Sequence, residues 1–348
     1  MQLGLSESLS SLVARRFAAA RDAGHLTFSA THLSIIHSSG IPFQLRYCPA
    51  LAKKPTGAPK PDGARTVPKP DPFRDPSPDL LLAQFPPENP AYTLVLNKFP
   101  VIHNHFIVAT KEWKPQADIL EAEDLEAAYA CVKVWGEQQN GGDSGPANAQ
   151  KRLFAFFNSG DASGASQPHR HLQFLPVESM RQDECGSWEP LVDRCSEAQE
   201  VGSSGCRQLG QLPFAHFAIP IPPSPSARTL HAMYLSLYRA AVKAANGESE
   251  SASAEGPAVI SYNLGLTEST MIICPRGNES ARIPVDDVDN DNVADAGTVS
   301  LNGTILAGTL MVKAEAEWNE LRSNQENLTN VLATIGYPPL DSRELSSL

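Results

Sequence analysis

The chain has 348 residues, of which 41% are hydrophobic, so it can bury a substantial core in one large domain or two modest ones. Its formal net charge of −11 argues against nucleic acid as the main partner, because a phosphate backbone requires a basic surface. No apolar run approaches the about 18 residues of a membrane span, and Met1 is followed by polar residues, so we expect neither a membrane segment nor a signal peptide.

The first third of the chain is predicted to contain one helix and several short strands. Apolar residues at helical spacing predict an amphipathic helix over residues 6–23, and residues 27–47 are expected to form short strands. Residues 53–90 are rich in proline and poor in periodic apolar residues, so we expect a long loop rather than a helix or a central strand. Residues 93–96 and 105–110 flank a turn and predict an antiparallel hairpin.

The rest of the chain alternates between predicted strands and predicted helices, which is typical of an α+β fold with an antiparallel sheet. Helices are expected at residues 120–137, 226–245 and 313–335. Strands are expected at residues 153–157, 214–220, 258–264 and 271–275, and residues 176–210 are expected to be rich in loops. Flexible surface loops are predicted near residues 53–90, 245–257 and 284–299.

Residues 158–176, NSGDASGASQPHRHLQFLP, carry the chemistry. Small, polar, turn-forming residues follow a buried apolar run, and the alternation of a strand then resumes. Because side chains of a strand point to opposite faces at every second residue, His169, His171 and Gln173 share one face. The preceding Gly/Ser loop has backbone N–H groups that could hold an anion. The segment therefore predicts a nucleophile beside a phosphate-binding loop.

Metal binding is the main alternative for two histidines on one strand face. The segment His103-Asn104-His105 has the same spacing but lacks both the Gly/Ser loop and the glutamine, so we do not expect it to be catalytic. No cysteine pair has zinc-binding spacing. The acidic segment at residues 286–295 fails the calcium-loop pattern, because Asn292 replaces the required glycine and Thr298 the bidentate glutamate. We expect no metal site built by the protein.

The segment GASQPHRHLQ resembles the active-site motif of the histidine-triad superfamily, in the nucleotidyltransferase branch with H-x-H-x-Q. The chain is most similar to the fungal-type diadenosine tetraphosphate phosphorylases, also called ATP adenylyltransferases. The resemblance implies a histidine-triad-like antiparallel sheet flanked by helices, in a single nucleotidyltransferase domain over residues 1–348. Besides this motif, it rests on LAKKP (51–55), LVLNKFPVIHNHFIVATKEW (94–113), PFAHF (213–217) and LNGTILAGTLMVK (301–313).

The resemblance implies reversible phosphorolysis of diadenosine 5′,5‴-P1,P4-tetraphosphate to ATP and ADP. His171 would be the nucleophile and would carry the nucleotide as a covalent adenylyl-histidine, since imidazole is largely neutral and nucleophilic near pH 7. We expect its other ring nitrogen to donate to a carbonyl group, with the backbone of His169 as the candidate. The amide of Gln173 would hold phosphate oxygens, at the position where the hydrolase branch has a third histidine.

Matching positions also implies a set of substrate contacts, which would include basic residues that offset the negative net charge. Phosphate oxygens would be held by Gly164, Ala165, Ser166 and Gln167, and ribose or phosphate by Asn158. Asn97 and Lys98 would line the nucleotide pocket, and Lys54, with Lys53 as the alternative, would reach the distal phosphates. The C-terminal side would be closed by Asn302, Gly303, Thr304, Thr309 and Lys313, and Arg276 is a further candidate cation.

Two other functions remain open at this point. A hexose-1-phosphate uridylyltransferase shares H-x-H-x-Q on a related fold, and a nucleotide-binding protein without turnover would keep the same pocket. The intact His171 and Gln173 argue against loss of turnover.

The expected partners are small molecules: dinucleoside polyphosphate, ATP, ADP and phosphate, with no nucleic acid and no membrane. We expect no bound cofactor, with a divalent cation such as Mg²⁺ accompanying the polyphosphate. The six cysteines form no C-x-x-C pair, which favours reduced thiols. We expect a monomer in the cytoplasm, with the nucleus as a second location.

Overall fold

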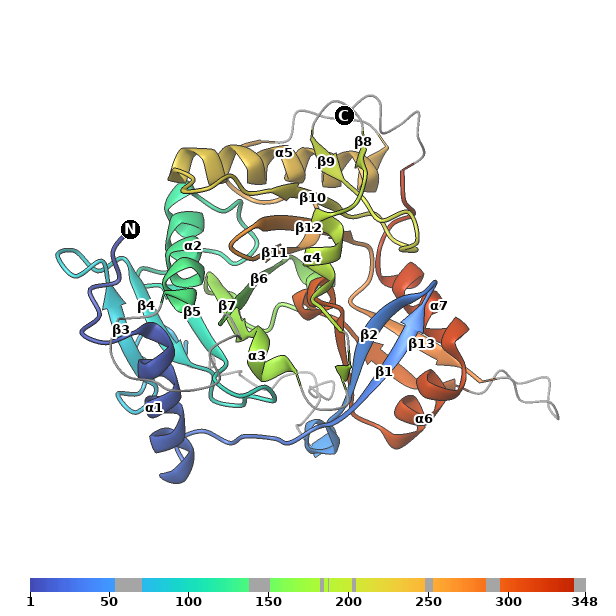
Figure 1. The fold of residues 1–348 in the computed structure, drawn as a ribbon, viewed down its shortest axis with the longest axis horizontal. Coiled ribbons are helices and arrows are strands. Elements are labelled where there is room, and N and C mark those ends of the chain that lie inside the picture. The colour runs from blue at the N-terminus through green and yellow to red at the C-terminus, as the bar shows by residue number, and fades with distance from the viewer. Residues whose placement is uncertain are drawn as a thin grey trace, which may run out of the picture.

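The structure is a computed structural model that describes residues 1–53, 71–137, 151–181, 185–186, 188–201, 205–247, 253–285 and 295–340. Figure 1 shows its helices and strands, which we label in chain order. The helices are α1 (Leu9–Asp22), α2 (Ala122–Gly136), α3 (Val177–Met180), α4 (Leu191–Ser196), α5 (Ala227–Asn246), α6 (Glu315–Ser323) and α7 (Gln325–Ile335). Short 3-10 turns that concern the site are η1 (Pro49–Lys53), η2 (Asp161–Ser163) and η4 (Gly303–Ala307).

The described strands form sheets of ten, three and two strands. The ten-stranded sheet has the order β3-β4-β5-β7-β6-β11-β12-β10-β9-β8. Its strands are β3 (Leu81–Phe85), β4 (Tyr92–Leu96), β5 (Phe106–Thr110), β6 (Leu153–Ser159), β7 (His171–Pro176), β8 (Glu200–Val201), β9 (Cys206–Arg207), β10 (Phe217–Pro220), β11 (Ser261–Leu266) and β12 (Thr270–Arg276). The smaller sheets are β1 (His32–Ser38), β2 (Ile41–Tyr47) and β15 (Thr309–Val312), and β13 (Ser280–Pro284) with β14 (Asp295–Ser300).

The large sheet joins the two halves of the chain at one strand pair. All of its pairings are antiparallel, and β6 from the first half pairs with β11 from the second, with Asn158 opposite Asn263. The motif strand β7 lies between β5 and β6, in the middle of the sheet (Figure 1). The predicted active-site strand is therefore held on both sides by hydrogen-bonded neighbours.

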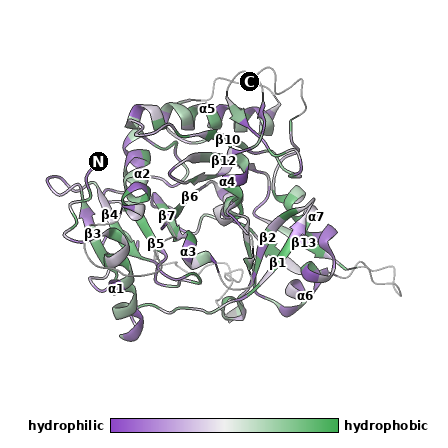
Figure 2. Ribbon diagram, viewed as in Figure 1, coloured by the Kyte–Doolittle hydropathy of each residue, from purple (hydrophilic) through white to green (hydrophobic). Residues whose placement is uncertain are grey.

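Helices α1, α2 and α5 pack on one face of the large sheet. Their buried side chains, including Val13, Leu125 and Tyr234, share one hydrophobic core with Leu172 and Phe174 of β7. In Figure 2, α5 carries both hydrophobic and hydrophilic segments along its length, as expected for a helix with one buried side. These helices thus cover the face of β7 opposite to His171 and Gln173.

A second layer covers part of the other face. It contains the small sheets, α4, α6, α7 and η4, and its core meets Phe154 and Phe156 of β6 and Leu175 of β7. Within this layer, β15 pairs with β2 in parallel, so the structure is not purely antiparallel. Near the start of β7 this face is covered instead by Phe73, which packs with Val95, Ile107 and Ala109 in a separate small cluster.

Most predicted elements are confirmed. The helices predicted at residues 6–23, 120–137 and 226–245 correspond to α1, α2 and α5, and the predicted hairpin is formed by β4 and β5. The strands expected in 27–47, 153–157, 214–220, 258–264 and 271–275 correspond to β1 with β2, and to β6, β10, β11 and β12.

Three predictions are corrected by the structure. The region expected to be loop over 53–90 ends in the edge strand β3, and the flanks of the loop expected near 284–299 pair as β13 and β14. The helix expected over 313–335 is two helices, because Asn324 is extended and its side chain accepts from the N–H of Glu326 at 3.1 Å as the N-cap of α7. The central parts of the three predicted loops, 54–70, 248–252 and 286–294, lie outside the described residues.

Candidate active site

The active-site segment begins where the β6–β7 ladder ends. The last pair of that ladder is Phe156 with Gln173, and two positions farther on Asn158 would face His171. At this position the Gln116 side chain makes the hydrogen bonds that strand pairing would otherwise provide. Its oxygen accepts from the His171 N–H at 2.7 Å. Its nitrogen donates to the carbonyls of Asn158 at 2.8 Å and His171 at 3.2 Å. Sequence reasoning missed Gln116. Its side chain substitutes for the missing hydrogen bonds between β6 and β7 and fixes the position of His171.

The two faces predicted for the motif strand are confirmed. Leu172 and Phe174 point into the helix-covered core, and Arg170 donates to Asp124 of α2 at 2.7 Å. Asp124 also accepts from the Tyr92 hydroxyl at 2.9 Å, so the buried cation and carboxylate are both satisfied. Arg170 thereby fastens the segment between the two histidines to helix α2.

His171 is 3% exposed and has the hydrogen bond that the sequence predicted. Its Nδ1 donates to the backbone carbonyl of His169 at 2.8 Å, which places the ring proton on Nδ1 because a carbonyl only accepts. Its Nε2 makes no hydrogen bond to another described side chain or backbone group. Burial lowers the pKa of His171 to about 4, despite the opposing effects of the His169 carbonyl and Asp71. The ring is therefore neutral near pH 7, with the lone pair of Nε2 available.

His169 precedes β7 and is held by two partners that the sequence did not suggest. Its Nδ1 lies 2.6 Å from Oδ2 of Asp71, and its Nε2 lies 3.1 Å from the Thr110 hydroxyl. Burial raises the pKa of Asp71, but the Phe73 N–H and His169 outweigh this effect and leave that pKa below its usual value. Asp71 and Phe73 lie in the region predicted to be an irregular loop, which offered no periodic signal to identify them.

Phe73 lies against both histidine rings. Its ring centroid is 4.9 Å from that of His171 and 5.8 Å from that of His169. It is 5% exposed, so it removes water from the space beside the two imidazoles. This packing accounts for the strong burial of His171 next to a surface loop.

The Gly/Ser loop packs closely on the C-terminal segment and leaves three backbone N–H groups without an acceptor among the described residues. Gly164 has φ +78°, and a Cβ there would lie 2.8 Å from Cβ of Asn302 and 2.9 Å from the Leu301 carbonyl, so only glycine fits without a shift. In the described part of the chain, no hydrogen-bond acceptor is found for the backbone N–H groups of Ala165, Ser166 and Gln167. These three consecutive donors lead directly to His169 and remain available to an anion.

Asn158 connects this loop to the C-terminal segment. Its side-chain oxygen accepts from Asn263 at 2.9 Å and from the Gly303 N–H at 2.8 Å. Gly303 is close enough that a Cβ would lie 2.7 Å from Phe156 and 2.9 Å from this same oxygen. The structure thus brings Asn158 and Gly164 together with Asn302 and Gly303 of the C-terminal segment, which is distant from them in the sequence.

The side chains of Arg276 and Thr309 form hydrogen bonds within the protein. The Arg276 guanidinium is buried and donates to the Asn263 side chain and to backbone carbonyls including Leu301. Thr309 is completely buried, and its hydroxyl donates to Gln44 at 3.1 Å. Both side chains have structural roles in this arrangement, and the ligand contacts predicted for them remain predictions.

The other C-terminal candidates lie on η4 and after β15. The Asn302 oxygen accepts from the Thr304 N–H at 3.0 Å, and this interaction caps η4. The Lys313 N–H donates to Glu317 at 2.9 Å, and the residue is half-buried. The substrate contacts assigned to these residues remain predictions.

The β4–β5 connection carries Asn97 and Lys98. Lys98 is exposed, and its ammonium lies 5.7 Å from the centroid of the Phe99 ring. The Asn97 amide nitrogen lies 2.9 Å from Nδ1 of His105, which is buried. Lys54 and the side chain of Lys53 lie outside the described residues.

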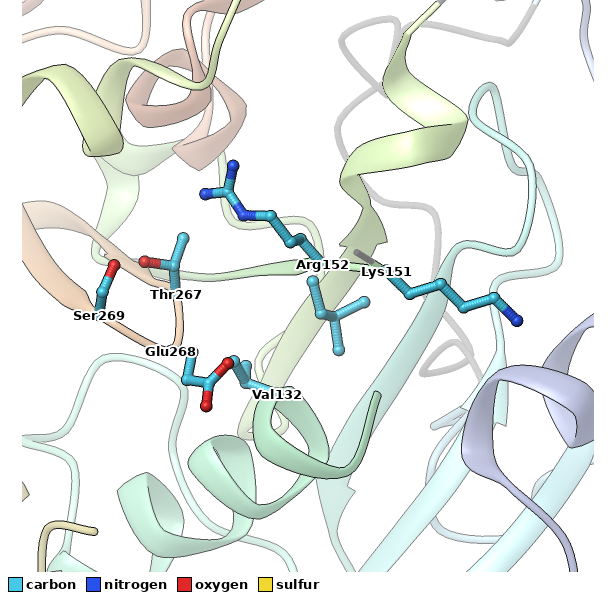
Figure 3. A pocket seen from close by; sticks show the side chains of 7 residues that line it. Val132, Lys151, Arg152, Thr267, Glu268 and Ser269 are labelled. Atoms are coloured by element: carbon cyan, nitrogen blue, oxygen red, sulfur yellow. The ribbon is translucent and has the colours of Figure 1, made fainter. Parts of the chain in front are cut away.

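Two cavities of the described structure lie away from this site. One of about 350 Å³ lies between the end of α2 and the β11–β12 turn, where Figure 3 shows Lys151 and Arg152 pointing in different directions. Another of about 170 Å³ is lined by Arg46, His103 and Phe28 among others. We therefore identify the site by its hydrogen-bonding groups rather than by a cavity. Phe73 packs against the His171 ring at this place.

The buried histidines predict a strong dependence of stability on pH. Burial lowers the pKa values of His105, His171 and His216 to about 4 each. Between pH 6.5 and 4 the unfolded chain binds protons that the folded protein does not, so stability falls as the pH falls. The slope of the unfolding free energy should approach about 4 kcal/mol per pH unit near pH 5, at about 1.4 kcal/mol for each histidine.

Urea unfolding measured at several pH values from 7.5 to 4.5 tests this expectation. His171→Ala should reduce the slope by about one third, since one of three lowered pKa values is removed. A stability that does not change between pH 6.5 and 5 would contradict it.

A neutral imidazole with one unbonded nitrogen, on a strand that follows a loop with unpaired backbone N–H groups, is suited to passing a nucleotidyl group between two phosphates. The chain is accordingly a nucleotidyltransferase. Two family models match it: the Ap4A phosphorylase N-terminal domain over residues 2–194 and the ATP adenylyltransferase C-terminal domain over residues 210–338. The chain therefore belongs to the Ap4A phosphorylase family, as the sequence motifs predicted.

Relatives from Saccharomyces cerevisiae match nearly the whole chain. Protein APA1 is 27% identical over 346 residues, which are 97% of this chain and 96% of that protein. Diadenosine 5′,5‴-P1,P4-tetraphosphate phosphorylase 2 is 26% identical over 344 residues, which are 96% of each chain. The crystal structure of yeast Ap4A phosphorylase Apa2 aligns with a TM-score of 0.75 at 23% identity, covering 97% of this chain and 100% of that one. This likeness confirms the α+β fold.

Proposed function

We propose that the protein catalyses the reversible phosphorolysis of diadenosine 5′,5‴-P1,P4-tetraphosphate to ATP and ADP through an adenylyl-His171 intermediate. The observation that carries this proposal is a neutral, buried His171 whose Nδ1 is bonded to the His169 carbonyl and whose Nε2 is unbonded, on the strand that follows the open N–H groups of residues 165–167. Membership in the Ap4A phosphorylase family supports the substrate. One relative has been crystallised in complex with Ap4A, which is the same dinucleotide.

In the first step, Nε2 of His171 attacks the phosphorus that carries one adenosine. A P–N bond forms as the P–O bond to the rest of the polyphosphate breaks, and ATP leaves with the electron pair on its terminal oxygen. Loop donors at Ala165, Ser166 and Gln167 offset the charge that develops on the non-bridging oxygens. No proton has to move, because the leaving phosphate is stable as an anion near pH 7.

The substituted ring keeps its Nδ1 proton and is therefore cationic. The His169 carbonyl, 2.8 Å from Nδ1, stabilises this charge, and Asp71 also favours a positive charge on His171. In the second step, an oxygen of inorganic phosphate attacks the same phosphorus. The P–N bond breaks, its electron pair returns to Nε2, and ADP is released. Two displacements at one site replace a direct encounter of two highly charged substrates.

Gln173 explains why phosphate rather than water is the preferred acceptor. Its amide can donate hydrogen bonds to phosphate oxygens but does not titrate near neutral pH. Water needs a base to become a competent nucleophile, whereas inorganic phosphate is already anionic. A site with glutamine here therefore favours phosphorolysis over hydrolysis.

We also propose that Mg²⁺ accompanies the polyphosphate and is not held by a dedicated protein site. Within the part of the chain that the structure describes, no group of three or more His, Cys, Asp and Glu side chains is arranged to hold a metal ion.

Among the described residues, no helix has the length and apolar character required to cross a membrane. We propose a monomer that acts on free nucleotides in the cytoplasm.

Phosphate dependence of the products tests the proposed function. With diadenosine tetraphosphate and saturating inorganic phosphate, we expect ATP and ADP in equal amounts and little AMP, because the acceptor supplies the second phosphate of ADP. Products are separated by ion-exchange chromatography. A matched reaction with UDP-glucose and galactose 1-phosphate as the acceptor should give no turnover. Abundant AMP at saturating phosphate would indicate a hydrolase, and turnover of the UDP-sugar alone would indicate a hexose-1-phosphate uridylyltransferase.

A further inference from the structure

His105 is a buried histidine that the reaction described above does not use. It is 7% exposed and lies just before β5, on the other side of the β5–β7 ladder from the motif. In that ladder Ile107 pairs with Gln173. Because antiparallel neighbours two positions apart share a face, His105 and Gln173 are diagonal neighbours on the same side of the sheet.

The orientation of the His105 ring is determined by a chain of hydrogen bonds. The Phe99 N–H donates to the side-chain oxygen of Asn97 at 3.0 Å, which orients the Asn97 amide. Its nitrogen therefore lies toward Nδ1 of His105, at 2.9 Å. Because that nitrogen can only donate, Nδ1 is the acceptor, and the ring proton of the neutral imidazole resides on Nε2.

The resulting Nε2–H group makes no hydrogen bond within the described structure. Nε2 of His105 is buried without a hydrogen-bond partner in the described structure. Burial lowers the pKa of His105 to about 4. The Gln173 side chain opposes part of this shift, as a hydrogen-bond acceptor would. The ring is thus neutral near pH 7 and presents a single buried donor beside the Gln173 amide. A buried donor of this kind requires an acceptor.

We propose that His105 is a positioning residue whose Nε2–H donates to Oε1 of Gln173, so that the Gln173 amide nitrogen faces the α-phosphate. Without this contact, the Gln173 amide can rotate by a half-turn and present its oxygen to the phosphate, where two acceptors repel each other. The sequence of donors then runs from the Phe99 N–H through Asn97 and His105 to Gln173. This inference rests on the proposed function.

Two substitutions separate the donor from the space that the ring fills. The His105→Gln side chain can place its amide nitrogen near the position of Nε2, whereas His105→Asn is too short and reaches only the position of Nδ1. We expect His105→Asn to lower kcat for phosphorolysis by about 10-fold or more, because the misoriented amide no longer stabilises the transition state. KM should change much less, and His105→Gln should recover most of the activity. His103→Ala is the matched control two residues away, and should behave as wild type.

A double-mutant cycle tests the route through Gln173. In a Gln173→Ala background, His105→Asn should have no further effect on kcat, since the group that it orients is absent. An equal loss in both backgrounds, or a failure of His105→Gln to recover activity in a folded protein, would overturn the proposal.

A second measurement does not depend on activity and so distinguishes this inference from the proposed function. In protein labelled with ¹⁵N-histidine, His105 should be the Nε2–H tautomer with a hydrogen-bonded ring proton, assigned by its loss in His105→Gln. Gln173→Leu should shift that proton to the resonance of an unbonded group. An Nδ1–H tautomer, or a proton resonance unchanged by Gln173→Leu, would overturn the positioning role. Inactive wild-type enzyme with these NMR signatures would contradict only the proposed function.

Discussion

Phosphorolysis by the His171→Ala variant is expected to fall by at least about 10⁴-fold, because no other group can form the covalent intermediate. The neutral His171 has its Nε2 unbonded and its Nδ1 proton fixed on the His169 carbonyl at 2.8 Å. Alanine removes the nucleophile but leaves the backbone contacts to Gln116, which hold the strand in place. The loss should therefore appear in kcat, with a far-ultraviolet circular dichroism spectrum like that of the wild type.

His103→Ala is the matched control, because His103 belongs to the other H-x-H segment. His103 is exposed and stacks on Phe28 with ring centroids 4.0 Å apart, so its removal should not affect turnover. Incubating the wild type with diadenosine tetraphosphate, without phosphate, should leave an acid-labile adenylyl group on the peptide that contains His171. Mass spectrometry detects this group. Turnover by His171→Ala without a trapped adduct would show that the covalent mechanism is wrong.

Gln173→His is expected to change the acceptor as well as the rate. Glutamine supplies oriented N–H donors, and loss of such a donor typically costs about 3 kcal/mol, or roughly 100-fold in rate. Histidine at this position would add a ring that can accept and donate a proton, on the same strand face as His171 and His105. Water can then be activated, so AMP should increase relative to ADP while phosphorolysis decreases.

The ratio of AMP to ADP, measured at equal phosphate concentration in variant and wild type, is the decisive quantity. Gln173→Ala is the control, because it removes the donor without adding a base. It should slow phosphorolysis and leave the ratio unchanged. If Gln173→His also leaves the ratio unchanged, Gln173 does not select the acceptor. The choice would then depend on the loop at residues 164–167.

Local patterns in the sequence were sufficient for much of the fold and for the local geometry around His171. Period-2 alternation predicted the two faces of the motif strand, and helical periodicity predicted α1, α2 and α5. The His171 hydrogen bond to the His169 carbonyl was predictable because the two residues are neighbours in the chain. The break at Asn324 was missed because the apolar periodicity continues through this residue. In the structure the Asn324 side chain caps the start of α7, so the predicted helix is interrupted there.

Contacts between distant segments were decided only by the tertiary structure. Asp71 and Phe73 lie about a hundred residues before the histidines that they contact, in a region without periodicity. Gln116 supplies hydrogen bonds just beyond the last residue pair of β6 and β7. The position of that last pair depends on how the two strands meet.

His105 belongs to a segment whose spacing alone made it look like an accidental copy of the motif. Its burial and its position beside Gln173 follow from the antiparallel pairing of β5 with β7. The sequence by itself therefore determined the α+β fold, the two faces of the motif strand and the His171 hydrogen bond to His169, because these depend on neighbouring residues. The groups that orient and bury the two histidines depend on which strands and loops meet, and this depends on packing across the whole chain.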